Sequence, residues 1–140
     1  MSSKPYPLTV SSSMLRDRLA LVTVAWFNKN NVPPRDLSGY EALAQDLKEM
    51  LDELGDTPWF VLGLEHILLD PDPAAARGYV NTRYAYTDEA ARSLLLYLLD
   101  KLAPGKTLDS SGPAAGVCLA EIEPEEWAQL RSSQTLPTAA

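Results

Sequence analysis

Four stretches of this chain repeat apolar residues at spacings of three and four, and a proline or glycine follows closely after each of them. Such spacings place apolar side chains on one face of a helix, whereas a half-buried strand alternates polar and apolar residues. The types of apolar residue also indicate helices, because the chain has 23 leucines and 17 alanines but only seven valines and two isoleucines. Leucine and alanine favour helices, and β-branched residues favour strands. We therefore expect helices over residues 11–27, 38–55, 57–70 and 87–102.

Three of these helices carry sequence signals at their ends. Ser38 followed by Glu41 matches a capping box, in which each side chain bonds to the backbone of the other residue. Gly55 stands where a helix C-terminal cap is expected. Thr57 directly precedes a proline and Thr87 precedes a leucine-rich stretch, so we predict both threonines as N-caps.

Some segments leave the choice between helix and strand open. Residues 19–27 and 59–69 are apolar on nearly every side, so buried strands are the alternative to the predicted helices. Residues 79–86 alternate aromatic and polar side chains, and residues 116–122 form a short apolar run, which predicts two short strands. A last short helix is expected to begin at Glu123, before a proline.

Together these segments predict a mainly α protein, or α+β with a minor β component. We expect four to five helices packed as a single domain, because 140 residues correspond to one domain of ordinary size. Residues 1–10 are predicted as a flexible N-terminal arm, residues 11–131 as the globular domain, and residues 132–140 as a flexible C-terminal tail.

The expected surroundings of the protein follow from its apolar runs and its cysteine. The longest apolar runs, 19–27 and 94–99, are far shorter than the roughly 20 residues that span a bilayer. Cys118 is the one cysteine, so no disulfide forms within the chain. We therefore expect a cytoplasmic protein without membrane association.

The net charge of −7 is unevenly distributed along the chain. Residues 1–35 carry five bases and one acid, whereas residues 36–72 carry ten acids and one base. A second acidic cluster lies within residues 121–126. Concentrated charge of one sign steers association with a partner of the opposite sign. The pattern makes a basic protein partner the leading expectation and nucleic acid an unfavoured one.

A partner-binding surface is the site that this charge pattern predicts. The simpler interpretation of an acidic helix face is a solvated surface, and part of the second cluster also stabilises a helix N-terminus. Aromatic and arginine side chains are common at protein interfaces, and Trp127, on a short helix between acids, is expected to be partly exposed. The predicted partner-binding residues are Glu41, Glu49, Asp52, Glu53, Glu121, Glu123, Glu125, Glu126, Trp127, Arg83 and Tyr84.

Catalytic and metal-binding motifs are weak in comparison. His66 is the one histidine, and the apolar residues around it favour a structural role at the edge of the core. Cys118 lies among apolar and acidic residues, whereas a nucleophilic cysteine needs a histidine or positive charge nearby. The segment that begins at Asp70 resembles the start of a calcium loop but lacks the required glycine and glutamate. We expect no metal ion and no cofactor.

The leading functional hypothesis is a small acidic, non-enzymatic interaction module, such as an adaptor, a chaperone or an inhibitor or immunity-type protein. One alternative is a small hydrolase-like enzyme that uses His66 with a carboxylate or with Cys118. Another alternative is a homo-oligomeric assembly or scaffold component, such as a homodimer. The dimer interface, or seam, would lie at residues 94–99, because the leucines there are too many to lie on one apolar face of a helix.

Overall fold

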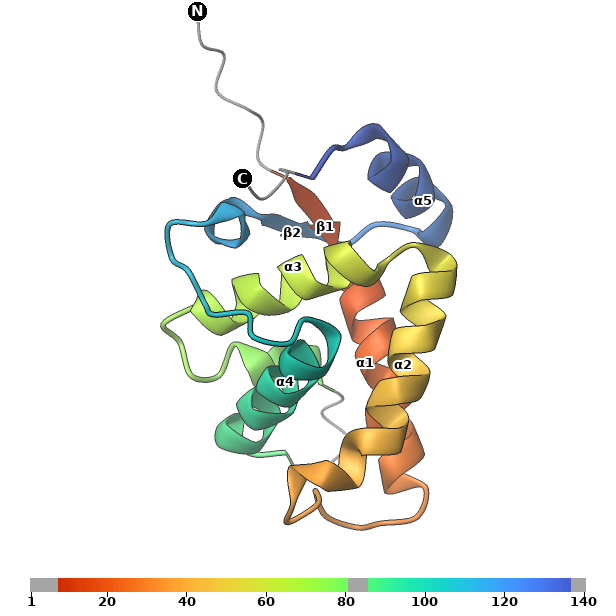
Figure 1. The fold of residues 1–140 in the computed structure, drawn as a ribbon, viewed down its shortest axis with the longest axis vertical. Helices are drawn as coiled ribbons and strands as arrows, with labels where there is room; N and C mark the ends of the chain where they lie inside the picture. The colour runs from red at the N-terminus through yellow and green to blue at the C-terminus, as the bar shows by residue number, and fades with distance from the viewer. Residues whose placement is uncertain (1–7, 81–85, 137–140) are drawn as a thin grey trace, which may run out of the picture.

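The computed structural model describes residues 8–80 and 86–136, and within them the chain forms five α-helices and a two-stranded sheet (Figure 1). Strand β1 (Thr9–Ser11) runs directly into α1, and strand β2 (Cys118–Ala120) precedes α5. The helices are α1 (Ser12–Phe27), α2 (Glu41–Leu54), α3 (Thr57–Leu69), α4 (Asp88–Leu102) and α5 (Pro124–Ser133). Short 3-10 helices cover Leu37–Tyr40, Ala76–Tyr79 and Pro113–Gly116. The fold is mainly α with a minor β component in a single domain, which confirms the predicted class.

Helix α3 is the centre of the core. Nine of its residues are buried, and they cover all sides of the helix. Helices α1 and α2 run antiparallel beside each other, α3 crosses them near one end of the pair, and α4 packs against both α3 and α2 (Figure 1). A helix that is apolar on every side is stable when neighbours enclose it, which explains the unbroken apolar run at 59–69. Both segments with a strand alternative, 19–27 and 59–69, are helical.

The predicted helix ends at Thr87 and Gly55 are confirmed, and Ser11 is the N-cap of α1. The Met14 backbone N–H donates to the hydroxyl of Ser11 at 3.0 Å, which caps α1. The hydroxyl of Thr87 accepts from the N–H of Ala90 at 3.0 Å, which caps α4. Gly55 ends α2 in the left-handed conformation, at a φ of 76°, where a residue without a Cβ meets no steric penalty.

Two predicted caps are wrong. Ser38 lies inside a 3-10 helix, and its N–H donates to the carboxylate of Asp36 at 3.0 Å, so the predicted capping box with Glu41 does not form. Thr57 is the first residue of α3, and Asp56 holds the N-cap position instead. The carboxylate of Asp56 makes no cap bond, because its oxygens accept from side chains elsewhere in the fold.

The sheet joins the two ends of the described chain. Strand β1 pairs in parallel with β2, with Val10 opposite Leu119 in the register. Thr9 and Val10 therefore belong to the folded domain and not to a flexible arm, and Val10 is fully buried. The predicted strand at 116–122 is confirmed over a shorter span. The predicted strand at 79–86 is wrong at Tyr79, which is helical, and residues 81–85 lie outside the described residues.

A side chain from beyond α5 completes the free edge of β1. The Thr9 N–H donates to Oε1 of Gln134 at 2.7 Å, and Nε2 of Gln134 donates to the Thr9 carbonyl at 2.9 Å. The amide therefore takes the place of a neighbouring strand's backbone and covers an edge that is otherwise open. Gln134 fell within the predicted flexible tail, so the folded domain extends past residue 131.

The leucines of α4 are used within the core. Leu94, Leu95, Leu98 and Leu99 are at most 4% exposed, because α2, α3 and two 3-10 helices pack around α4. Leu96 alone among the five leucines of 94–99 reaches the surface, at 39% exposed. The core of a single chain therefore accounts for four of the five leucines at the predicted dimer seam, 94–99. Within the described residues, every helix is too short or too polar to traverse a lipid bilayer.

We expect Gly63→Ala to destabilise the protein. A Cβ at Gly63 would lie 2.7 Å from both methyl groups of Leu15, a fully buried side chain that cannot move towards solvent. Overpacking of this kind costs about 1–3 kcal/mol, more than the helix propensity that alanine gains. Urea unfolding measures the loss, with Gly78→Ala as the control because open space surrounds Gly78. A Leu15→Val background should recover part of the loss, and equal stability of the two alanine variants would contradict the close contact.

We expect Gln134→Ala to lower the free energy of unfolding by about 1–2 kcal/mol, because two partly buried backbone bonds of Thr9 lose their partner. Gln129→Ala is the matched control, since Gln129 is exposed on α5 and its side chain has no partner within the described residues. Hydrogen exchange at the Thr9 amide should accelerate in the first variant and stay unchanged in the second. Unchanged protection of Thr9 in both variants would contradict the role given to Gln134.

Candidate functional site

Asp56 joins three helices that are far apart in the sequence. Its side chain is 2% exposed and lies between α2 and α3. Oδ1 of Asp56 accepts from Trp127 Nε1 at 3.1 Å and from Arg131 Nη1, both on α5. Oδ2 accepts from Nη2 of Arg18, on α1, at 3.5 Å. A buried charge is tolerated only when it is paired and hydrogen-bonded, as this carboxylate is.

The turn between α2 and α3 positions this carboxylate. The left-handed Gly55 ends α2, and the N–H of Asp56 donates to the carbonyl of Leu51 at 2.9 Å. The carbonyl of Asp56 then accepts from the N–H of Phe60 at 2.8 Å, so the first bond of α3 also fixes this residue. Backbone bonds on both sides hold Asp56 at the point where α5 passes over the turn.

Trp127 packs α5 against α3. Its ring meets the ring of Trp59 edge to face, with centroids 5.9 Å apart and planes at 90°. Trp127 is 4% exposed, so the prediction that it is partly exposed is wrong. The physical reason is that its ring covers Trp59 while its N–H satisfies Asp56, and both contacts require burial.

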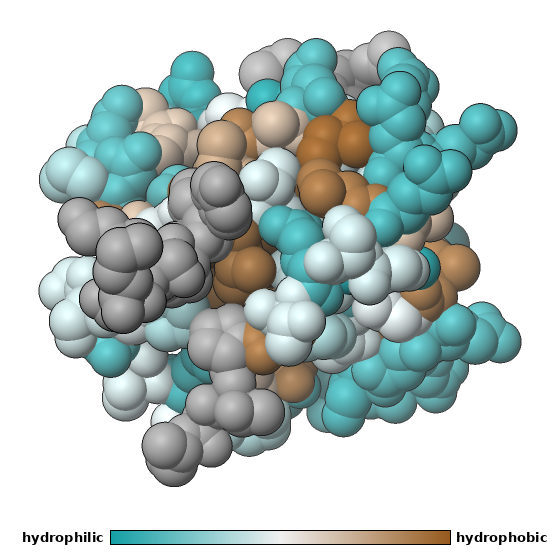
Figure 2. All heavy atoms as spheres, turned by 90° about the horizontal axis from the view of Figure 1, so that it is seen from above, coloured by the Kyte–Doolittle hydropathy of each residue, from teal (hydrophilic) through white to brown (hydrophobic). Residues whose placement is uncertain are grey.

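A cavity of about 360 Å³ lies beside Asp56, between the first turns of α1 and α5 and the end of α2. The side chains of Arg18, Asp56 and Arg131 supply its charged inner part, while Asp17 and Glu123 are its exposed carboxylates. Figure 2 looks onto the end of the molecule that carries α5, where hydrophobic groups show between hydrophilic ones. The other lining residues are Ser11, Ser13, Met14, Leu54, Ile122, Pro124, Trp127 and Ala128.

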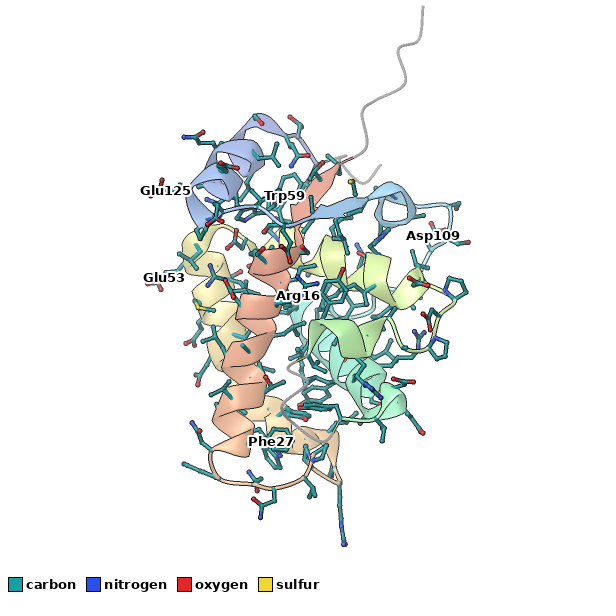
Figure 3. All side chains as sticks on the ribbon, turned by 180° about the vertical axis from the view of Figure 1, so that it is seen from behind. Arg16, Phe27, Glu53, Trp59, Asp109 and Glu125 are labelled. Carbon is teal, nitrogen blue, oxygen red and sulfur yellow. The ribbon has the colours of Figure 1, made fainter. Side chains whose placement is uncertain are left out.

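The predicted acidic residues of α2 and α5 are exposed. Figure 3 shows Glu53, from the end of α2, and Glu125, from the start of α5, on the same side of the molecule and pointing away from it. Tertiary structure therefore places Glu53 and Glu125, which belong to clusters distant in the sequence, on one side of the fold. The exposed carboxylates predicted for this site are Glu41, Glu49, Asp52, Glu53, Glu121, Glu123, Glu125 and Glu126.

Some of these carboxylates have partners within the chain. Glu121 pairs with Arg16 at 3.0 Å, and Arg16 also lies over the ring of Tyr79. Glu49 accepts from Gln45, and Asp52 accepts from the hydroxyl of Thr57. The side chains of the other five predicted acids make no hydrogen bond or ion pair within the described part of the chain. Their charge is therefore available to a partner.

The remaining predicted residues do not extend this site. Arg83 and Tyr84 lie outside the described residues. His66 is half-buried, with Nδ1 2.8 Å from the carbonyl of Ala114, and it lines a separate cavity together with Asp70. Cys118 is exposed on β2 and does not line that cavity. Among the described residues, no group of three or more histidine, cysteine or acidic side chains could hold a metal ion.

Sequence reasoning missed Arg18, Asp56 and Arg131 as site residues. Arg18 directly follows Arg16 and Asp17, so its charge does not stand out in the sequence. Asp56 follows the glycine that ends α2, a position at which an acid is ordinary. Their convergence depends on how α5 returns to the other helices, which no local pattern encodes.

Comparison with protein-family models, with curated proteins and with solved structures found no match for this chain.

We expect Asp56→Ala to lower the free energy of unfolding by about 3 kcal/mol, because it leaves two half-buried guanidinium groups and a buried indole N–H without their acceptor. Urea unfolding followed by tryptophan fluorescence measures this loss, and the emission of Trp127 should shift to the red as α5 loosens. Glu53→Ala removes an exposed acid three residues away and should change stability by less than about 0.5 kcal/mol. Equal stability of the two variants would contradict the central role of Asp56.

Proposed function

We propose that this protein is a small non-enzymatic interaction module that binds a basic partner protein through an acidic face. The acidic face consists of the exposed carboxylates at the end of α2, Glu49, Asp52 and Glu53, and those at the start of α5, Glu123, Glu125 and Glu126. The observation that carries the proposal is that Glu53 and Glu125, one residue from each group, lie on the same side of the fold (Figure 3).

Helix stability does not account for the α2 part of this face. Asp52 and Glu53 lie in the last turn of α2, which contains no basic residue. The C-terminal end of a helix dipole is negative, so carboxylates there are destabilising, whereas Glu125 and Glu126 lie in a first turn where they are favourable. Residues that oppose a local stability rule are most often found at functional sites. This placement supports a role in binding for Glu53, whereas the carboxylate of Asp52 also accepts from the hydroxyl of Thr57.

The chemistry of the face favours a protein with clustered lysine or arginine. Concentrated negative charge raises the rate of encounter with a basic surface and rejects acidic ones. The exposed Leu54, next in sequence to Glu53 and 43% exposed, adds an apolar contact at the edge of the face. Phosphate backbones are disfavoured as partners because they carry the same sign of charge as the face.

We further propose that this binding takes place in the cytoplasm. The lone cysteine of the chain, Cys118, is an exposed free thiol. Such a thiol persists in reducing surroundings and is prone to oxidation outside them.

The double variant Glu49→Lys/Glu53→Lys tests this function. Partners captured from a native lysate by the unchanged protein are quantified against those captured by the variant, and a peptide of alternating lysine and leucine serves as a defined probe. We expect the variant to lose the captured partner and to bind the probe about tenfold more weakly at low ionic strength, because two attractive charges become repulsive.

The matched control is Glu89→Lys/Asp100→Lys, which changes the net charge equally at exposed acids of α4. This control should keep both the partner and most of the affinity for the probe. Equal losses in the two double variants would show that only net charge matters and would contradict a specific acidic face.

A further inference from the structure

The cavity beside Asp56 holds more hydrogen-bond donors than the chain itself uses. Arg18 and Arg131 share the single carboxylate of Asp56, so their two positive charges meet one negative charge. Each guanidinium has five N–H donors, and each donates to Asp56 through one nitrogen. The Nε of Arg18 is buried without an acceptor within the described residues. The inner part of the cavity therefore carries a net positive charge with unused donors.

The first turn of α1 adds to this preference for an anion. Ser11, Ser13 and Met14 line the same cavity, and the first turn of α1 contains no acidic residue. The N-terminal end of a sixteen-residue helix carries a partial positive charge that favours a nearby anion. Guanidinium groups bind carboxylates with two parallel hydrogen bonds where the geometry allows.

The mouth of the cavity has the opposite charge. Asp17 and Glu123 are exposed, line the cavity and have no side-chain partner within the described residues. Two free carboxylates beside the opening repel a doubly charged phosphate. They attract a cationic group that lies a few bonds away from the anion at the inner end. The charge pattern thus fits one ligand that carries both signs.

The volume of the cavity limits the size of the ligand that it can hold. A volume of about 360 Å³ lies at the lower end of the range for small-molecule sites, which is about 300–1,000 Å³. It suits one or two amino-acid residues. The side chains of Met14, Leu54 and Pro124 offer apolar contact between the positive inner part and the negative mouth.

We propose that this cavity binds the C-terminal residue of a partner protein when that residue is arginine or lysine. The α-carboxylate accepts from Arg18 and Arg131, the aliphatic part of the side chain contacts Met14 and Leu54, and the terminal cation meets Asp17 and Glu123. The inference rests on the proposed function, since it names the part of the basic partner that enters the cavity next to the acidic face.

Three peptides of equal length test the two charges separately. The probes are acetyl-Gly-Ala-Leu-Arg with a free C-terminal carboxylate, the same peptide as its C-terminal amide, and the free acid with citrulline in place of arginine. Affinities are measured by calorimetry and by the fluorescence of Trp127, which lines the cavity. We expect the amide and the citrulline peptide each to bind about tenfold more weakly, because each lacks one charge-assisted contact. Equal affinity for all three peptides, or no binding of the first, overturns the proposal.

Variants of the mouth provide a second test without disturbing the fold, because Asp17 and Glu123 are exposed and unpaired. Asp17→Asn/Glu123→Gln should weaken the arginine peptide about tenfold and leave the citrulline peptide unchanged. The control Glu89→Gln/Asp100→Asn alters two exposed acids of α4 that do not line the cavity, and it should affect neither peptide. Equal weakening of both peptides by the mouth variant contradicts the assigned contact.

The two proposals fail in different ways. If Glu49→Lys/Glu53→Lys abolishes partner capture while the three peptides bind alike, the acidic face stands and the cavity proposal fails. If the peptides are discriminated but the face variant keeps its partner, the cavity proposal stands and the acidic face fails. Free L-arginine, tested beside the peptides, distinguishes a peptide terminus from a small molecule as the ligand. Tighter binding of the amino acid than of the arginine peptide would contradict the C-terminus of a partner protein as the ligand.

Discussion

The buried carboxylate of Asp56 is the interaction on which the arrangement of the three helices around it depends. It accepts hydrogen bonds from the indole N–H of Trp127 and the guanidinium of Arg131, both on α5, and from the guanidinium of Arg18 on α1. Each of these groups would be costly to bury without an acceptor. Helix α5 is joined to the rest of the fold through a loop and a three-residue strand. Its position over α1 and α3 therefore depends on these side-chain contacts.

The candidate site is a consequence of that docking. With α5 held in place, the first turns of α1 and α5 and the exposed end of α2 enclose a cavity beside Asp56. The same docking places Glu125 on the side of the molecule where Glu53 projects (Figure 3). The acidic face and the cavity therefore have one structural origin, and a change that loosens α5 would alter both.

Charge placement in α2 shows where stability and the proposed function oppose each other. Asp52 and Glu53 face the negative end of their own helix dipole, and no base in the last turn offsets them. In α4 the order is the favourable one, with Asp88 in the first turn and Lys101 in the last. One chain thus contains a helix that follows the rule and another that departs from it, and the departure lies at the proposed binding face.

The sequence by itself determined the helices and most of their ends, because apolar spacing, Gly55 and Thr87 act within one or two turns of the backbone. It also located the exposed acids, since an acidic helix face is read from the same spacing. It did not reveal strand β1, the burial of Trp127 or the meeting of Arg18, Asp56 and Arg131. Those features join residues more than 30 positions apart in the chain. Only tertiary structure decided them, because their free energy comes from pairing and burial between distant segments, which no local pattern records.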